Sequence, residues 1–294
     1  MYYVYKRGPS TGAVALAKAL GGKRLRSQEK LLSRLKPGDV VVFWGSSISP
    51  GLIPEGVTTI NNNTPITKRR ELDLLREAGV PTVEVHDGTP EEGILPTFVD
   101  TVSNLNALLA TDPATTELLE DFVRAANDAI AKCNEAMSST DRGIWLPRAN
   151  NHRSGRDLIN PPARPDFWVR KVNIKEEYRV HSFDGRSIRL AKKVKDEHYN
   201  RTPHPWIRTL SNGWRFSYVG TDNQAIRDVA HQAVAAVGLT FGGVDIAITD
   251  DDQIIALEVN RTPGLKNGTS KAYARAIKRY VDEEENDDVQ REDH

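Results

Sequence analysis

A chain of 294 residues can form one large domain or two to three small ones. Its 40 basic and 40 acidic side chains balance, so bulk charge indicates neither nucleic-acid nor membrane binding, although the arginine-rich stretch 142–170 leaves a local basic patch open. The single cysteine, Cys133, excludes an intramolecular disulfide and a cysteine-type zinc site and fits a reducing compartment. Because we recognise no long apolar run and no signal peptide, we expect a cytoplasmic protein without a membrane segment.

The N-terminal part, up to residue 62, predicts a small α/β unit. We expect strands at 2–5 and 39–45 and helices at 13–20 and 27–35. The second strand is apolar after its first residue, as strands of a parallel sheet are. The turn at 8–12 joins a strand to a helix, so its amides could face an anion. Its glycines lack the GxGxxG spacing, which argues against dinucleotide binding. We expect the turn to face a substrate and not an adenine.

The middle part, residues 63–165, predicts mostly scaffold. It contains expected helices at 65–78 and 96–136, the latter in two pieces, and expected strands at 80–85 and 144–148. The loop at 150–157 is polar, basic and contains a glycine. It is suited to closing over phosphate, and an ordinary solvated surface loop would look the same.

The C-terminal part predicts a β-rich block at 166–281, followed by a charged tail at 282–294 that we expect to be disordered. The expected elements are strands at 167–172, 177–183, 186–193, 214–219, 244–248 and 254–260, and helices at 221–237 and 270–281. Glu177, Arg179 and His181 alternate onto one face of their strand. Such a regular polar face is either solvated or the floor of an active site.

The last expected hairpin predicts a metal site. Glu258 and Asn260 are two residues apart on a strand and therefore share a face, and Asp245 of the preceding strand can lie opposite them. Three hard oxygen donors in one patch suit Mg²⁺. An ordinary hairpin with polar residues in water is the alternative. Apolar residues flank both carboxylates, however, which indicates burial, and a buried carboxylate needs a partner.

Four segments in this order resemble the ATP-grasp superfamily of carboxylate–amine ligases. They are residues 61–68 with 78–81, Arg148 with 152–157, residues 177–185, and Asp245 with 258–265. The chain is most similar to the glutamate-ligase branch that modifies ribosomal proteins and to phage-encoded relatives. Two positions depart from the family. Gly243 stands where D-alanine ligases carry an arginine, and Arg148 replaces a commoner lysine.

The resemblance implies a mixed α+β and α/β architecture. In this ATP-grasp fold, residues 1–62 would form a Rossmann-like pre-ATP-grasp unit. Residues 63–165 would form a lid subdomain with a helical insert, and residues 166–281 the grasp core. The implied reaction is the ADP-forming ligation of a carboxylate to an amine through an acyl phosphate. The implied cofactors are ATP and one or two Mg²⁺ ions.

The resemblance also assigns roles to residues. The metal would be bound by Asp245, Glu258 and Asn260. The α- and β-phosphates would be contacted by Lys68 and Arg148, and the γ-phosphate by Ser154 and Gly155. The adenine would contact the backbone of Trp168, Val169, Arg170, Lys171 and Val172, the ribose would be bound by Glu177, and the acyl phosphate or substrate carboxylate by Arg179, Lys192 and Arg208. For the last three, exposed strand charges are the alternative.

Two other functions stay open at this point. A kinase on the same fold would phosphorylate a hydroxyl, and a non-catalytic protein would only bind nucleotide. The implied partners of a ligase are a small-molecule or peptide carboxylate and an amine, and homo-oligomers are common in the family. The identity of both substrates is open.

Overall fold

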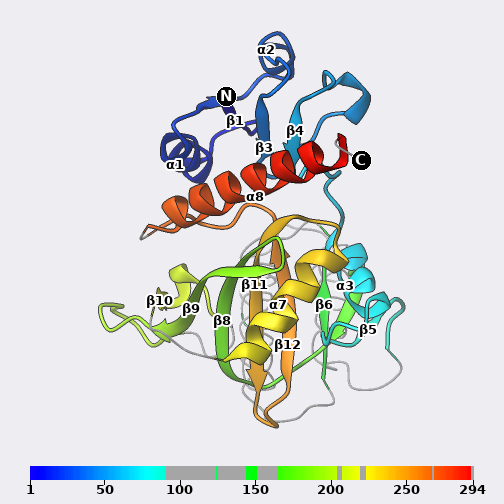
Figure 1. Ribbon diagram of the computed structural model, residues 1–294. Helices are drawn as coiled ribbons and strands as arrows, with labels where there is room; N and C mark the ends of the chain where they lie inside the picture. The colour runs from blue at the N-terminus through cyan, green and yellow to red at the C-terminus, as the bar shows by residue number, and fades with distance from the viewer. Residues whose placement is uncertain are drawn as a thin grey trace, which may run out of the picture.

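The computed structural model describes residues 1–90, 124, 144–150, 164–203, 207–218, 223–266 and 268–292, the last eight of them as backbone only. Three sheets are present in this part of the chain, and the long C-terminal helix lies between the N-terminal sheet and the large sheet (Figure 1). Our expectations for residues 91–123, 125–143 and 151–163, including the two-piece helix and the phosphate loop, lie outside the described residues.

The N-terminal unit is a parallel four-stranded sheet of order β2-β1-β3-β4 flanked by short helices. Its elements are β1 (Tyr2–Tyr5), α1 (Thr11–Leu20), β2 (Lys23–Leu25), α2 (Gln28–Leu32), β3 (Val40–Phe43), η1 (Pro50–Leu52) and β4 (Thr58–Ile60). The parallel sheet is as expected from the apolar β3, whereas β2 and β4 are too short to have been expected. Ser10 caps α1 by accepting a hydrogen bond from Ala13, and Gly21 ends the helix at φ 72°.

The middle part contributes one helix and a small antiparallel sheet of order β5-β7-β6. Its elements are α3 (Lys68–Glu77), β5 (Val85–His86), β6 (Trp145–Arg148) and β7 (Phe167–Arg170). The helix begins at Lys68 and not at Pro65, because Thr67 is the residue whose side chain caps it. Of the expected strand at 80–85, only Val85 belongs to β5. Near the start of that range, Pro81 and Thr82 bond instead to Ala256 of the large sheet.

The large sheet is antiparallel, with five strands in the order β10-β9-β8-β11-β12. Its strands and following helices are β8 (Ile174–Phe183), β9 (Arg186–Lys195), η2 (Leu210–Asn212), β10 (Trp214–Ser217), α7 (Gln224–Ala236), β11 (Phe241–Thr249), β12 (Ile254–Asn260) and α8 (Thr269–Glu292). Asp184 and Gly185 join β8 to β9 with φ of 46° and 64°, as a tight hairpin turn requires. Asn223 caps α7, so the helix begins at Gln224 and not at residue 221 as expected.

Helix α7 covers one face of the large sheet (Figure 1). Its buried residues, from Ile226 to Val234, pack against Val180, Val244 and Ile246. Strand residues alternate in direction, so the neighbours of these valines and isoleucines point to the opposite face. That face is turned toward the small sheet, and a cleft lies between the two sheets.

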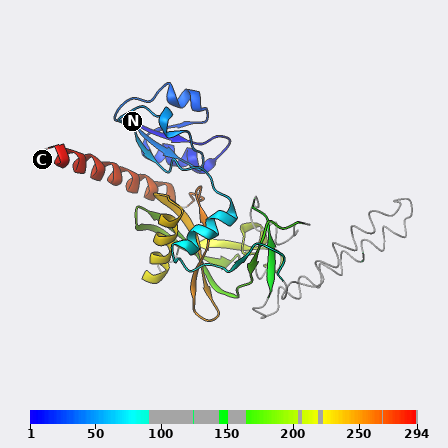
Figure 2. The same ribbon diagram turned by 90° about the vertical axis from the view of Figure 1, so that its right-hand side faces the viewer.

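Helix α8 joins the N-terminal unit to the core, and from the side its C-terminal end extends away from the sheets (Figure 2). Tyr273 of this helix, Trp44 after β3 and Phe241 of β11 pack together as aromatic pairs with ring centroids 5.3–5.7 Å apart. The backbone of α8 continues past Val281, where we expected it to end, to Glu292. Among the described residues, no helix has the length and apolar character needed to cross a membrane.

Candidate active site

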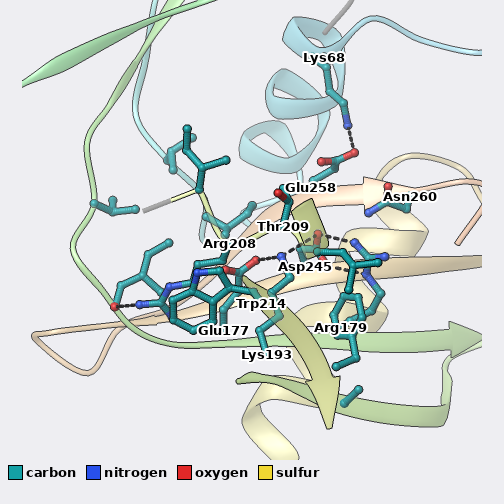
Figure 3. A pocket seen from close by; sticks show the side chains of 18 of the residues that line it. Lys68, Glu177, Arg179, Lys193, Arg208, Thr209, Trp214, Asp245, Glu258 and Asn260 are labelled. Carbon is teal, nitrogen blue, oxygen red and sulfur yellow. Dashed lines mark hydrogen bonds and ion pairs between the residues drawn. The ribbon is translucent and has the colours of Figure 1, made fainter. Parts of the chain in front are cut away.

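A cleft of about 830 Å³ lies between the large and small sheets. One end is apolar and is lined by residues such as Leu146, Val169 and Ile174. The other end is polar, and its side chains come from α3 and from strands β8, β9, β11 and β12 (Figure 3). An apolar slot that continues into a charged patch suits a ligand with a ring at one end and anionic groups at the other.

The polar floor is an ordered row of side chains. Asp245 of β11 pairs directly with Glu258 of β12 on one side and with Arg179 of β8 on the other. The next row toward the N-terminal unit contains Asn260, Gly243 and His181. The expected position of Asp245 opposite Glu258 is therefore confirmed. The polar face of β8, with Glu177, Arg179 and His181, lines the cleft and is not a solvated surface.

Gly243 has a packing reason to be glycine. A Cβ atom at this position would lie 2.6 Å from Cβ of Pro263, in the turn after β12. The arginine that D-alanine ligases carry there would therefore require the Pro263 turn to move.

Asp245 is the most tightly held carboxylate in the cleft. It accepts two hydrogen bonds of 2.6 Å from Arg179, and Lys193 lies 3.8 Å away. Burial acts to raise the pKa of Asp245, but Arg179 and Lys193 outweigh it and bring the pKa to about 2. The carboxylate is therefore ionised across the physiological range. Asn260 completes this group: with its amide turned so that both partners are satisfied, the nitrogen donates to Glu258 (3.0 Å) and the oxygen accepts from Arg179 (3.2 Å).

Lys68 reaches the same floor from the first turn of α3 (Figure 3). Its ammonium lies 2.7 Å from Glu258 and 3.5 Å from Glu71. Burial alone would lower the pKa of Lys68, but the two carboxylates outweigh it and the pKa is raised. Lys68 is thus a charged group at the polar end of the cleft.

Glu177 lies nearer the apolar end and forms a buried ion pair with Lys193. Burial raises the pKa of the Glu177 carboxyl, and the Lys193 ammonium opposes that rise. Arg208 is at the same end, stacked 4.6 Å over Trp214 and donating to the carbonyl of Ile174 at 2.5 Å. Arg208, which we expected to bind the acyl phosphate or the substrate carboxylate, thus lies near the apolar end of the cleft, on the far side of Glu177 from Asn260 (Figure 3).

Lys192 requires a correction. It pairs with Tyr178 across β8 and β9, bonds to Glu176 at 2.5 Å and does not line the cleft. The reason is a β-bulge in β9, which shifts the register by one residue between His181 and Ser182. The shift turns Lys192 to the other face and brings Lys193 onto the floor.

The strand expected to contact adenine lines the cleft only in part. Val169, Arg170 and Val172 are in the lining, whereas Trp168 and Lys171 are not. Lys171 is 2% exposed and faces a separate cavity of about 530 Å³ behind the strand. Its N–H bonds to the carbonyl of Ile144 (2.8 Å).

Arg148 lines the cleft, whereas Ser154 and Gly155 lie outside the described residues.

Sequence reasoning missed Glu71 and Lys193 and left His181 without a role. Glu71 could have been noticed as a charged residue on the apolar side of α3, next to Leu72 and Leu75. His181 is 1% exposed, lines the cleft and is 3.2 Å from the hydroxyl of Tyr273. Burial and the facing Arg179 lower the pKa of His181 to about 3, so the imidazole is neutral.

The donor set fits a magnesium ion by its chemistry. Asp245, Glu258 and Asn260 bring two carboxylates and one amide oxygen to adjacent strands, and oxygen donors are what Mg²⁺ takes. Within the described part of the chain, no cluster of three or more His, Cys, Asp or Glu side chains is arranged to hold a metal by itself. Such an ion would therefore need further oxygens, from water or from phosphate.

No protein-family model matches the chain, and no curated protein matches it. Solved structures do match over nearly the full length. The ATP-grasp ligase PsnB with a minimal precursor, Mg and ADP superposes with a TM-score of 0.55 at 14% identity, covering 95% of this chain and 97% of that chain. D-Alanine–D-alanine ligase from Bacillus anthracis with ATP gives 0.54 at 12%, covering 96% and 99%. The D-cycloserine synthetase DcsG gives 0.50 at 16%, covering 95% and 99%. At such identities the likeness concerns the fold.

Proposed function

Because the chain has the ATP-grasp fold, we propose that it is an ATP-dependent, ADP-forming ligase that joins a carboxylate to an amine. The observation that carries the proposal is the charge of the cleft. Among the described residues that line it, eight are Lys or Arg and four are Asp or Glu, although the whole chain is neutral. A cationic cleft in a neutral protein favours anionic ligands, such as nucleotide phosphates and a carboxylate.

The nucleotide would lie along the cleft with its base in the apolar end. Glu177 is close enough to that end to bind ribose hydroxyls, and Arg208 would help to enclose the base. Lys68 and Arg148 would contact the phosphates above the row that contains Asp245. We infer this direction because the apolar lining stops where the charged floor begins.

Asp245, Glu258 and Asn260 would hold magnesium, which would neutralise phosphate charge and orient the γ-phosphoryl group for transfer. In the free protein, Arg179 and Lys68 neutralise the two carboxylates. These cations would turn to the phosphates and the substrate when the nucleotide binds.

The reaction itself has two steps. A carboxylate oxygen attacks the γ-phosphorus, the bond from that phosphorus to the β-bridging oxygen breaks, and ADP leaves. The amine nitrogen then attacks the carbonyl carbon of the acyl phosphate, the C–N bond forms, inorganic phosphate leaves and the nitrogen loses one proton. Both the substrate and the intermediate are anionic, which gives Arg179 a function in each step.

The test is a search for ADP release dependent on both substrates. Free amino acids and short peptides are offered as carboxylates and amines in pairs with Mg·ATP, and products are analysed by mass spectrometry. Peptides are included because a solved structure of PsnB contains a precursor peptide. A new amide, and a hydroxamate when hydroxylamine replaces the amine, would support the ligase. A phosphate ester would instead indicate a kinase, and AMP with pyrophosphate another ligase chemistry. Nucleotide binding without turnover would indicate a binding protein.

A matched pair of variants controls this assay. Asp245→Asn removes a carboxylate from the cleft floor and should abolish turnover. Asp252→Asn removes the same charge from the turn of the same hairpin, where Asp252 is 73% exposed and pairs with Lys175, and should leave turnover unchanged.

A further inference from the structure

Glu71 is a carboxylate to which the proposed reaction assigns no role. It is 6% exposed, lines the cleft and lies in the first turn of α3. A carboxylate in a first turn interacts favourably with the helix dipole, which would explain its presence without any function. Its two contacts indicate more than that.

The first contact is with the edge of the large sheet. Strand β12 is the outermost strand, so some of its N–H groups have no neighbouring strand to bond to. Glu71 accepts one of them, the N–H of Val259, at 2.9 Å, between the two proposed metal ligands Glu258 and Asn260. A glutamine would satisfy this N–H equally well. Burying a charged carboxylate costs free energy, so the charge needs a second reason.

The second contact supplies that reason. The oxygen of Glu71 that binds Val259 also lies 3.5 Å from the ammonium of Lys68. Lys68 therefore has two counter-charges that differ in mobility. Glu71 is buried and anchored to the backbone, whereas the side chain of Glu258 is 36% exposed and faces the cleft.

We propose that Glu71 is a positioning residue that holds Lys68 in place while Glu258 exchanges Lys68 for magnesium. The inference rests on the nucleotide-binding part of the proposed function. Without the Glu71 charge, Lys68 would have Glu258 as its remaining carboxylate partner among the described residues. Magnesium would then have to break that ion pair, and no carboxylate of the described residues would hold the Lys68 ammonium on the cleft floor while it contacts the phosphates. Glu71 thus makes Glu258 available to the metal.

The test measures the affinity for ADP by calorimetry, in excess Mg²⁺ and in EDTA. Glu71→Gln keeps an acceptor for Val259 and nearly the same shape, and it removes the charge. We expect the gain in ADP affinity that Mg²⁺ provides to fall about tenfold, the lower range for a charge-assisted hydrogen bond. Affinity in EDTA should be unchanged or higher, because one negative charge has been removed from an anion site. Glu77→Gln removes the same charge from the exposed end of α3, where Glu77 pairs with Arg70, and should change neither value.

A double-mutant cycle identifies Lys68 as the intermediary. In a Lys68→Gln background, Glu71→Gln should lose most of its effect on the magnesium dependence. An effect of equal size in that background, or an equal loss of affinity with and without Mg²⁺, would overturn the inference and leave Glu71 a structural group. Wild-type protein that does not bind ADP would overturn this inference and the proposed function together. Binding of Mg·ADP without amide formation would refute only the proposed ligase reaction. The ratio of the ADP affinities with and without Mg²⁺ would still decide the role of Glu71.

Discussion

Lys192 and Lys193 are adjacent lysines that the structure places on opposite faces of one strand, and replacing each by methionine should have very different effects. Lys193→Met leaves the buried carboxylate of Glu177 without its ammonium partner, where the two side chains are 12% and 6% exposed. Removing one partner of a buried pair typically costs about 3–5 kcal/mol. Burial already raises the pKa of Glu177. Uptake of a proton by this carboxyl should therefore limit the loss to about 2–3 kcal/mol.

Lys192→Met breaks an ion pair with Glu176 in which the side chains are 36% and 31% exposed. Pairs of this kind contribute only about 0.2–1 kcal/mol. Methionine keeps most of the apolar stem of Lys192 and loses the ammonium, which lies 5.6 Å over the Tyr178 ring. We therefore expect a difference of about 2 kcal/mol between the two variants in the free energy of unfolding from urea titrations.

The two methionine variants should also differ in their affinity for nucleotide. Affinity for Mg·ADP should fall clearly in Lys193→Met and stay within about twofold of wild type in Lys192→Met, because only Lys193 lines the cleft. Adding Glu177→Gln to Lys193→Met should restore most of the lost stability, since no buried charge is then unpaired. Equal destabilisation by the two methionines, or a larger effect of Lys192→Met, would refute the bulged register and the floor built on it.

Three further predictions address other parts of the molecule. Glu258→Gln should largely abolish Mg·ATP-dependent turnover while circular dichroism and the unfolding midpoint stay near wild type, because a metal ligand charge is lost and the shape is kept; turnover at the wild-type rate would refute the metal assignment. The pKa of His181 is about 3 in the folded protein against ~6.5 unfolded, so the unfolded chain binds the extra proton between these values. Stability should therefore be complete above pH ~6.5 and fall as the pH drops toward 3, by at most about 1.4 kcal/mol per unit; His181→Gln should flatten this slope in urea titrations, and the exposed His198→Gln should not. Asn61 has φ 62° and bonds three times to the backbone of Thr240 and Phe241, so Asn61→Ala should cost about 3 kcal/mol; the same change at the exposed Asn63 should cost little, and equal losses would contradict this joint between the N-terminal unit and the core.

The sequence by itself determined those elements of this protein that depend on short, local residue patterns. The apolar run of β3 predicted a buried parallel strand. The two residues Asp184-Gly185, between the expected strands at 177–183 and 186–193, are typical of the tight turn that joins β8 to β9. Both signals lie within a few neighbouring residues. The two-residue period of β8 placed Glu177, Arg179 and His181 on one face for the same reason. Burial of that face could not be predicted, because it depends on which layer covers the sheet.

The tertiary structure decided which residues meet on the floor, and two β-bulges are the physical cause. In the β11–β12 hairpin, a regular register continued from the turn would pair Asp245 with Leu257. The extra residue in β12 shifts the register by one, so Asp245 pairs with Glu258 instead. The bulge in β9 likewise replaces Lys192 by Lys193. Each inserts one residue into a pattern of period two and so exchanges the faces of every residue beyond it, which no periodicity in the sequence reveals. The position of Glu71 in the cleft could not be predicted from the sequence either. Its partner Val259 is far away in the chain and contributes only a backbone N–H, which every residue except proline carries.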